Sequence, residues 1–161
     1  MAAILSMGAA AIHFGVTSEH FQEYAPFGVF FAVIGWLQIA WAWFVISRPT
    51  RWLVVAGAAG NLLVVIIWLV SRSAGLPLGP DAGLAESASF IDVLSTLFET
   101  LIVVFTCIWL GSGVRRKGAG RKVLALCAGF VALIVMTSTS YALAQPAEHA
   151  PEDCAEHVDH P

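Results

Sequence analysis

The chain has 161 residues, of which 58% are hydrophobic and only 12% are charged. Soluble domains average about 45–50% apolar and about 25% charged residues, so a soluble globule of this size could not bury the apolar surface present here. The high hydrophobicity excludes a disordered chain, and a net charge of −3 disfavours a nucleic-acid binder. The composition therefore predicts a small, all-α, polytopic membrane protein that contacts the lipid bilayer.

Four segments are long and apolar enough to cross a bilayer, which takes about 17–25 residues. They cover residues 27–46, 52–70, 90–109 and 123–144. Residues 1–16 form a fifth candidate, which is short and lacks the basic start of a secretory signal peptide. The sequence thus predicts a bundle of five transmembrane helices within residues 1–144, or of four if the first segment does not cross.

The basic residues predict the orientation of this bundle. Seven of the eight Lys and Arg residues lie in the two loops on one side of a five-helix arrangement, around residues 48–51 and 115–122. Basic loops face the cytoplasm. We therefore expect a multi-pass protein of a bacterial inner membrane, with a cytoplasmic N-terminus. The acidic tail at 145–161 is then outside, where its polar, Pro-containing sequence predicts disorder.

Two stretches of the chain resemble a group of small bacterial membrane proteins. The first is WLVSRSAGLPLGP at residues 68–80, which precedes a helix that carries Asp92 and Glu99. The second is IHFGVTSEHFQEY at residues 12–24, which precedes an apolar helix with a central glutamine. The resemblance covers roughly residues 10–110 and implies no reaction or ligand.

Polar residues inside the predicted spans are functional candidates, because such residues are costly in a membrane. Asp92, Thr96 and Glu99 are spaced i, i+4 and i+7, which places them on one face of a helix. His13 and His20 share a face in the same way if the first helix continues past residue 16. These residues predict a polar track that runs from the outer surface into the bundle.

One interpretation of the track is a site for a transition metal, copper or zinc, at the outer face. Imidazole nitrogen and carboxylate oxygen are suitable ligands for both metals. The expected ligands are His13, His20, Asp92 and Glu99. Two further carboxylates, Glu19 and Glu23, are alternates. An intramembrane metalloenzyme would use the same residues, so the sequence leaves enzymatic activity open. Haem is disfavoured, because His13 alone lies within a span.

Two other interpretations need no metal. Glu99 could be the titrating group of a proton or cation path. Alternatively, Glu99, Gln38 and Asn61 lie at similar depth, counting 1.5 Å per residue, and could simply hold the helices together by hydrogen bonds. In that case the chain would be an accessory subunit of a larger membrane complex or a homo-oligomer.

The tail carries a second set of metal-ligating side chains. The members are His149, Cys154, His157 and His160. Such residues at short spacing in a flexible chain can capture copper or zinc, although a solvated acidic end has the same composition. The preceding segment ends in Ala-Leu-Ala, which also allows cleavage after Ala144.

Overall fold

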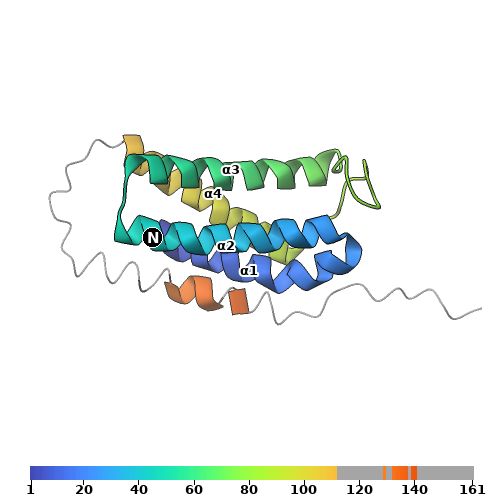
Figure 1. The fold of residues 1–161 in the computed structure, drawn as a ribbon, viewed down its shortest axis with the longest axis horizontal. Helices are drawn as coiled ribbons and strands as arrows, with labels where there is room; N and C mark the ends of the chain where they lie inside the picture. The colour runs from blue at the N-terminus through green and yellow to red at the C-terminus, as the bar shows by residue number, and fades with distance from the viewer. Residues whose placement is uncertain (112–128, 130–131, 138, 141–161) are drawn as a thin grey trace, which may run out of the picture.

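The computed structural model describes residues 1–111, 129, 132–137 and 139–140. The helical fold class is confirmed for this part of the chain, which contains four long helices (Figure 1). They are α1 (Ala2–Glu23), α2 (Ala25–Ser47), α3 (Arg51–Ser73) and α4 (Phe90–Gly111). By length and composition, α2, α3 and α4 could each cross a membrane, which supports a membrane protein.

The predicted segments 27–46, 52–70 and 90–109 lie within α2, α3 and α4, respectively. Helix α1 extends well past residue 16 and ends at Glu23, so His13 and His20 do belong to one helix. It is not among the three membrane candidates, and its second half carries four of the ionisable residues. The predicted segment 123–144 lies largely outside the described residues, as does the whole tail, so the total number of spans stays a prediction.

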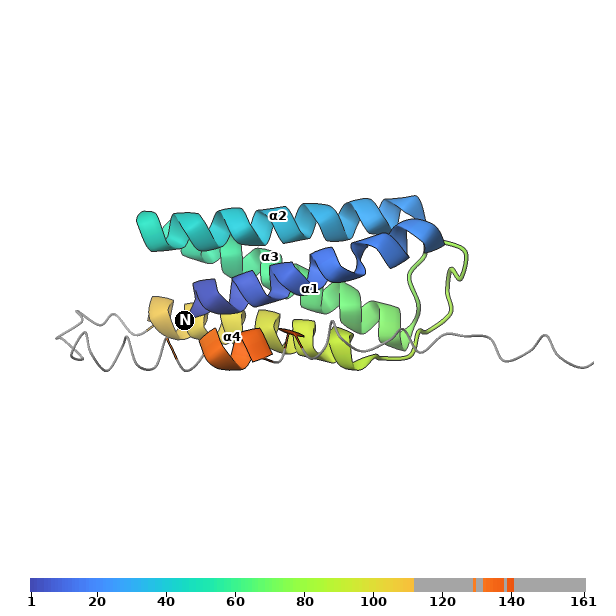
Figure 2. The same ribbon diagram turned by 90° about the horizontal axis from the view of Figure 1, so that it is seen from below.

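Helices α1 and α2 form a tight antiparallel hairpin that is joined by the single extended residue Tyr24. Pro26 occupies the first turn of α2, where its missing N–H leaves no hydrogen bond unmade. Gly28 lets the two helices approach closely, because a Cβ atom there would lie 2.2 Å from the Phe21 ring. The hairpin therefore places the end of α1 beside the start of α2 (Figure 2).

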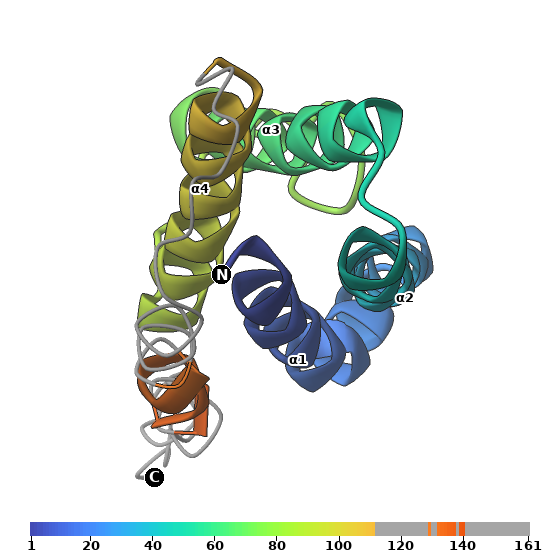
Figure 3. The ribbon, with the colours of Figure 1, turned by 90° about the vertical axis from the view of Figure 1, so that its left-hand side faces the viewer.

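The four helices form an open ring rather than a closed bundle. Helix α1 packs against α2 and α4, and α3 packs against α4, whereas α2 and α3 make few contacts (Figure 3). The main α2–α3 contact is the Trp41 indole, which lies over Gly57 and donates through Nε1 to the Leu53 carbonyl at 2.8 Å. The loose α2–α3 junction leaves space between the helices on the inner side of the ring.

The apolar core lies at the α1–α4 interface, around Ile12, Phe98 and Ile102. Many large apolar side chains point outward instead, including Trp43 at 69% and Trp52 at 84% exposed. Exposed apolar surface on this scale is unusual for a soluble monomer. The outer faces of α2 and α3 are therefore suited to contact with lipid.

Candidate functional site

Polar side chains from all four helices meet inside the ring. His13 of α1 and Glu99 of α4 are 3% and 1% exposed, and His13 Nε2 lies 3.0 Å from Glu99 Oε1. Gln38 of α2 donates through Nε2 to the same Glu99 oxygen at 3.3 Å and to Asn61 Oδ1 of α3 at 3.5 Å. Glu99 and Gln38, which the sequence places at similar depth, are thus in contact, and this buried polar chain connects the four helices.

A cavity of about 430 Å³ extends from this polar chain to the end of the bundle that carries the loop of residues 74–89. Its walls are mostly apolar and rich in rings, including Phe27, Phe30 and Phe31 of α2. His13 and Glu99 line it at the deep end. The shape is that of a ligand pocket, which typically has apolar walls and a few polar groups at fixed places.

Four polar atoms of side chains that line the cavity are buried and have no hydrogen-bond partner among the described residues. They are His13 Nδ1, Ser95 Oγ, Trp68 Nε1 and Arg72 Nε. Buried polar groups in native proteins are nearly always paired, and an unpaired one costs about 1–3 kcal/mol. None of the four is exposed in the cavity itself, so a bound molecule would reach one of them only after its side chain has turned.

Phe31 of α2 lies between the two histidines of α1. Its ring is stacked on the His20 ring with centroids 4.2 Å apart, and its centroid is 5.5 Å from that of His13. His20 Nδ1 in turn lies 3.0 Å from Glu23 Oε2 at the outer end of α1. One wall of the cavity therefore alternates imidazole and aromatic rings from the deep end towards the loop.

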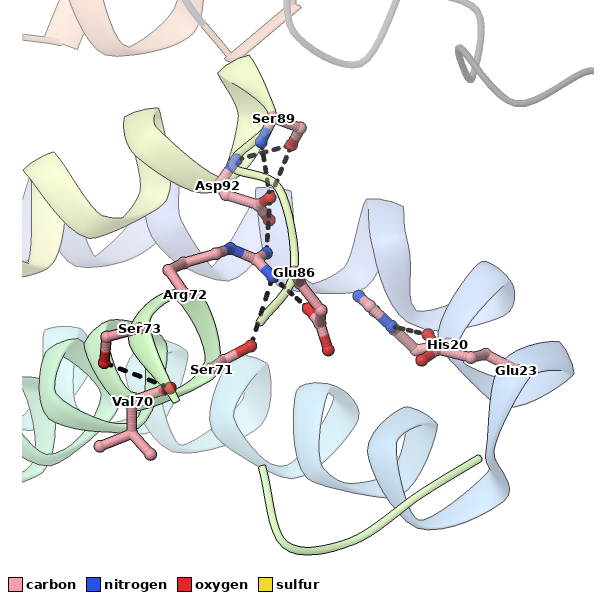
Figure 4. A network of polar contacts seen from close by, with 9 residues as sticks. All are labelled: His20, Glu23, Val70, Ser71, Arg72, Ser73, Glu86, Ser89 and Asp92. Atoms are coloured by element: carbon pink, nitrogen blue, oxygen red, sulfur yellow. Dashed lines mark hydrogen bonds and ion pairs between the residues drawn. The ribbon is translucent and has the colours of Figure 1, made fainter. Parts of the chain in front are cut away.

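Arg72 of α3 stands at the loop end of the cavity, between carboxylates from two segments (Figure 4). Its guanidinium contacts Glu86 of the loop and lies 2.8 Å from Asp92 Oδ2 of α4. Glu86 is also held through its backbone N–H, which donates to the Ser71 carbonyl at 3.2 Å. These contacts tie the loop to α3 and α4 over the mouth of the cavity.

Asp92 helps to cap the start of α4. Its carboxylate accepts hydrogen bonds from the Ser89 backbone N–H at 3.0 Å and the Ser89 hydroxyl at 2.8 Å, while the Asp92 N–H donates to Ser89 Oγ at 3.2 Å (Figure 4). This reciprocal arrangement is a capping box, with a carboxylate in the first turn that also favours the helix dipole. Asp92 is therefore occupied by a cap and an ion pair.

The four residues proposed as metal ligands lie at two levels of the cavity. His13 and Glu99 meet at the deep end, whereas His20 and Asp92 bind Glu23 and Arg72 at the mouth. A spacing of i, i+7 gives a common helix face but separates two residues by about 10 Å along the axis, which is too far for one metal ion. Within the described residues, no group of three or more His, Cys, Asp or Glu side chains is placed to hold a metal ion.

The remaining predicted residues have different surroundings. Thr96 lines the cavity, so Asp92, Thr96 and Glu99 do share one face, although Thr96 stays outside the hydrogen-bonded chain in the described part of the protein. Glu19 is exposed and does not line the cavity. The tail residues His149, Cys154, His157 and His160 lie outside the described residues.

Reasoning from the sequence did not single out Arg72, Trp68 or Ser95. Arg72 carried a signal, because the predicted five-span arrangement leaves it as the one basic residue on the side of the acidic loop. Trp68 and Ser95 resemble ordinary residues of an apolar span, and only their burial beside a cavity distinguishes them. Comparison with family models, curated proteins and solved structures finds no match to this chain.

Proposed function

We propose that this chain is a membrane protein that binds a small, mostly apolar molecule with one polar group in the cavity between its four helices. The observation that carries the proposal is the cavity itself, whose apolar walls converge on the buried His13–Glu99 pair. The polar group of the ligand would lie at this pair, at the deep end of the cavity. The apolar body would lie against the rings of α2.

The proposal includes an orientation in the membrane. Arg48 follows α2 and Arg51 begins α3, which favours the cytoplasmic side for this end of the bundle. The cavity mouth and the loop of residues 74–89 are at the other end of α3 and would face the exterior of a bacterial inner membrane. Five spans remain the proposed total, with the acidic tail outside.

Photolabelling of the protein in lipid nanodiscs would test for a ligand pocket. The probe is a phenyl diazirine that carries a hydroxymethyl group, and the competitor is excess benzyl alcohol. We expect labelling of the Phe30 and Phe31 side chains, located by fragmentation of the labelled peptide, to be saturable and to fall on competition. Lipid-facing side chains such as Val33, which is 49% exposed, should be labelled without saturation.

A pair of matched variants sharpens this test. Val16→Trp fills the cavity from α1, whereas Val33→Trp makes the same change on the exposed outer face of α2. The saturable labelling should disappear in the first variant and persist in the second. Labelling that never saturates, or that survives Val16→Trp unchanged, would contradict a ligand pocket at this place.

Metal binding is a second proposal, supported by the contact between His13 Nε2 and Glu99 Oε1 beside the cavity. A cation there would need further ligands, either from the bound molecule or from the tail. Elemental analysis of the purified protein, with and without residues 145–161, would measure it. Metal near one ion per chain in both forms, lost in Glu99→Gln but not in Glu86→Gln, would place the ion in the bundle and open the way to a metalloenzyme.

Two further proposals use the same residues without a resident ligand. Glu99 could serve a proton path, which would require Glu99→Gln to abolish proton flux through reconstituted vesicles. Alternatively, the polar chain around Gln38 could only hold the helices together, as in an accessory subunit of a larger membrane complex or a homo-oligomer. That packing role is what remains if no saturable ligand, metal or proton flux is found.

A further inference from the structure

The charged groups around the cavity are unevenly balanced. Four carboxyl groups line it, against one guanidinium. The carboxyl groups are Glu23, Glu86, Asp92 and Glu99. Arg72 already contacts two of them, so this three-residue cluster carries a net negative charge. Among the described residues, the other two carboxyl groups have only histidines as ionisable partners, and an imidazole compensates a carboxylate fully only when it is protonated.

The carboxyl group at the deep end of the cavity is the most buried of the four. Glu99 is 1% exposed, and its Oε1 atom faces a histidine and the neutral amide of Gln38. A buried carboxylate is costly unless a positive charge or a proton compensates it. A cation bound in the cavity would supply that charge at the place where water has least access.

The walls of the cavity favour the same class of molecule. Five aromatic side chains line it, from the α1–α2 turn, α2 and α3: Tyr24, Phe27, Phe30, Phe31 and Trp68. The face of an aromatic ring attracts a cation, and more strongly when the pair is desolvated. The other apolar residues of the wall are mostly aliphatic, among them Val16, Val64 and Ile91, and would accept the apolar body of the ligand.

From this combination we infer that the ligand is a lipophilic cation, an amine or quaternary ammonium group on an aromatic or aliphatic body. This inference rests on the proposed function, because it names the class of molecule for the same cavity. The cationic group lies at the His13–Glu99 end, and the body extends along the rings of α2 towards Arg72. An anionic ligand would be repelled by the four carboxylates of the cavity, and the Arg72 guanidinium is already paired with two of them.

Two ligands of the same shape and different charge would test the inference. Benzyltrimethylammonium is the cation, and neopentylbenzene, in which carbon replaces nitrogen, is its neutral isostere. Binding of both radiolabelled compounds is measured by equilibrium dialysis on nanodiscs of phosphatidylcholine, with empty nanodiscs subtracted. We expect the cation to bind at least about tenfold more tightly, which corresponds to about 1.4 kcal/mol.

A substitution then locates the charge that is responsible. Glu99→Gln should reduce the affinity for the cation about tenfold and leave that for the neutral compound unchanged. Retained binding of the neutral compound also shows that the cavity has folded. The control is Asp81→Asn, which removes the same charge from an exposed loop residue that does not line the cavity, and it should change neither affinity.

The possible outcomes separate this inference from the proposed function. Equal or tighter binding of the neutral compound would overturn the cationic class and leave the pocket intact. Failure of both compounds to bind, while the diazirine probe still labels saturably, would also overturn the cationic class alone. Failure of both compounds and of saturable labelling would overturn the pocket as well. The comparison on the unsubstituted protein needs no variant to fold.

Discussion

At the scale of single residues, the His13–Glu99 pair joins α1 to α4 through two buried side chains. Removing one member of a buried pair leaves the other without its partner, at a cost of about 3–5 kcal/mol. We therefore expect His13→Leu alone to lower the free energy of unfolding by about 3 kcal/mol. The double change His13→Leu with Glu99→Leu should cost less than the single one, because no unpaired carboxyl group remains. Unfolding in mixed detergent micelles would measure both values.

His20 provides the control for this prediction on the same helix. It makes a contact of the same length, 3.0 Å to Glu23, but the two side chains are 25% and 36% exposed. Exposed pairs of this kind contribute about 0–1 kcal/mol, so His20→Leu should change the free energy of unfolding by about 0.5 kcal/mol or less. Equal costs for His13→Leu and His20→Leu would show that burial does not strengthen the inner pair.

At the scale of elements, the capping box decides where α4 begins. Ser89→Ala removes the hydroxyl that accepts from the Asp92 N–H and should lower the free energy of unfolding by about 1 kcal/mol. Hydrogen exchange at residues 90–94 should accelerate, because the first turn frays. Ser87→Ala, at an exposed loop position, is the matched control and should have no effect on either measurement. Unchanged exchange in Ser89→Ala would contradict the cap.

The junction of α2 and α3 includes a close approach of the Trp41 indole to Gly57. A Cβ atom at Gly57 would lie 2.1 Å from the Trp41 indole, so Gly57→Ala must displace the ring that donates to Leu53. We expect a loss of about 1–3 kcal/mol in the free energy of unfolding. Gly60→Ala, one turn further along the same helix, meets no atom within 4 Å and should be neutral or slightly stabilising. A similar response of the two variants would argue against the Trp41 contact.

The sequence allowed the helices to be predicted better than the contacts between them. Length and apolarity suffice to locate α2, α3 and α4, and the rise per residue places Glu99 level with Gln38. Helical spacing alone does not predict which residues form a site, because two residues at i and i+7 on one face lie at different depths in the bundle. Whether Asp92 binds a metal, caps its helix or pairs with Arg72 depends on the path of the loop before α4. The periodicity of the helices does not predict that path. The cavity depends equally on the loose α2–α3 junction.

At the scale of the whole molecule, the ends of α3 should lie on opposite sides of the membrane. This helix has 23 residues and is thus about 34 Å long, slightly more than the hydrocarbon core of about 30 Å. Arg48 and Arg51 at its start favour the cytoplasmic side, and the loop with Asp81 follows its other end. In a background without the native cysteines, an impermeant maleimide added to intact spheroplasts should therefore label Asp81→Cys but not Pro49→Cys.

Lysis of the spheroplasts should expose Pro49→Cys to the same reagent, which serves as the internal control for reactivity. Labelling of both positions before lysis would contradict a membrane-spanning α3. Labelling of Pro49→Cys alone before lysis would invert the orientation, because the mouth of the cavity would then open to the cytoplasm. The cavity lies in the half of the bundle next to the loop, so this one measurement also decides from which side a water-borne ligand reaches the His13–Glu99 pair.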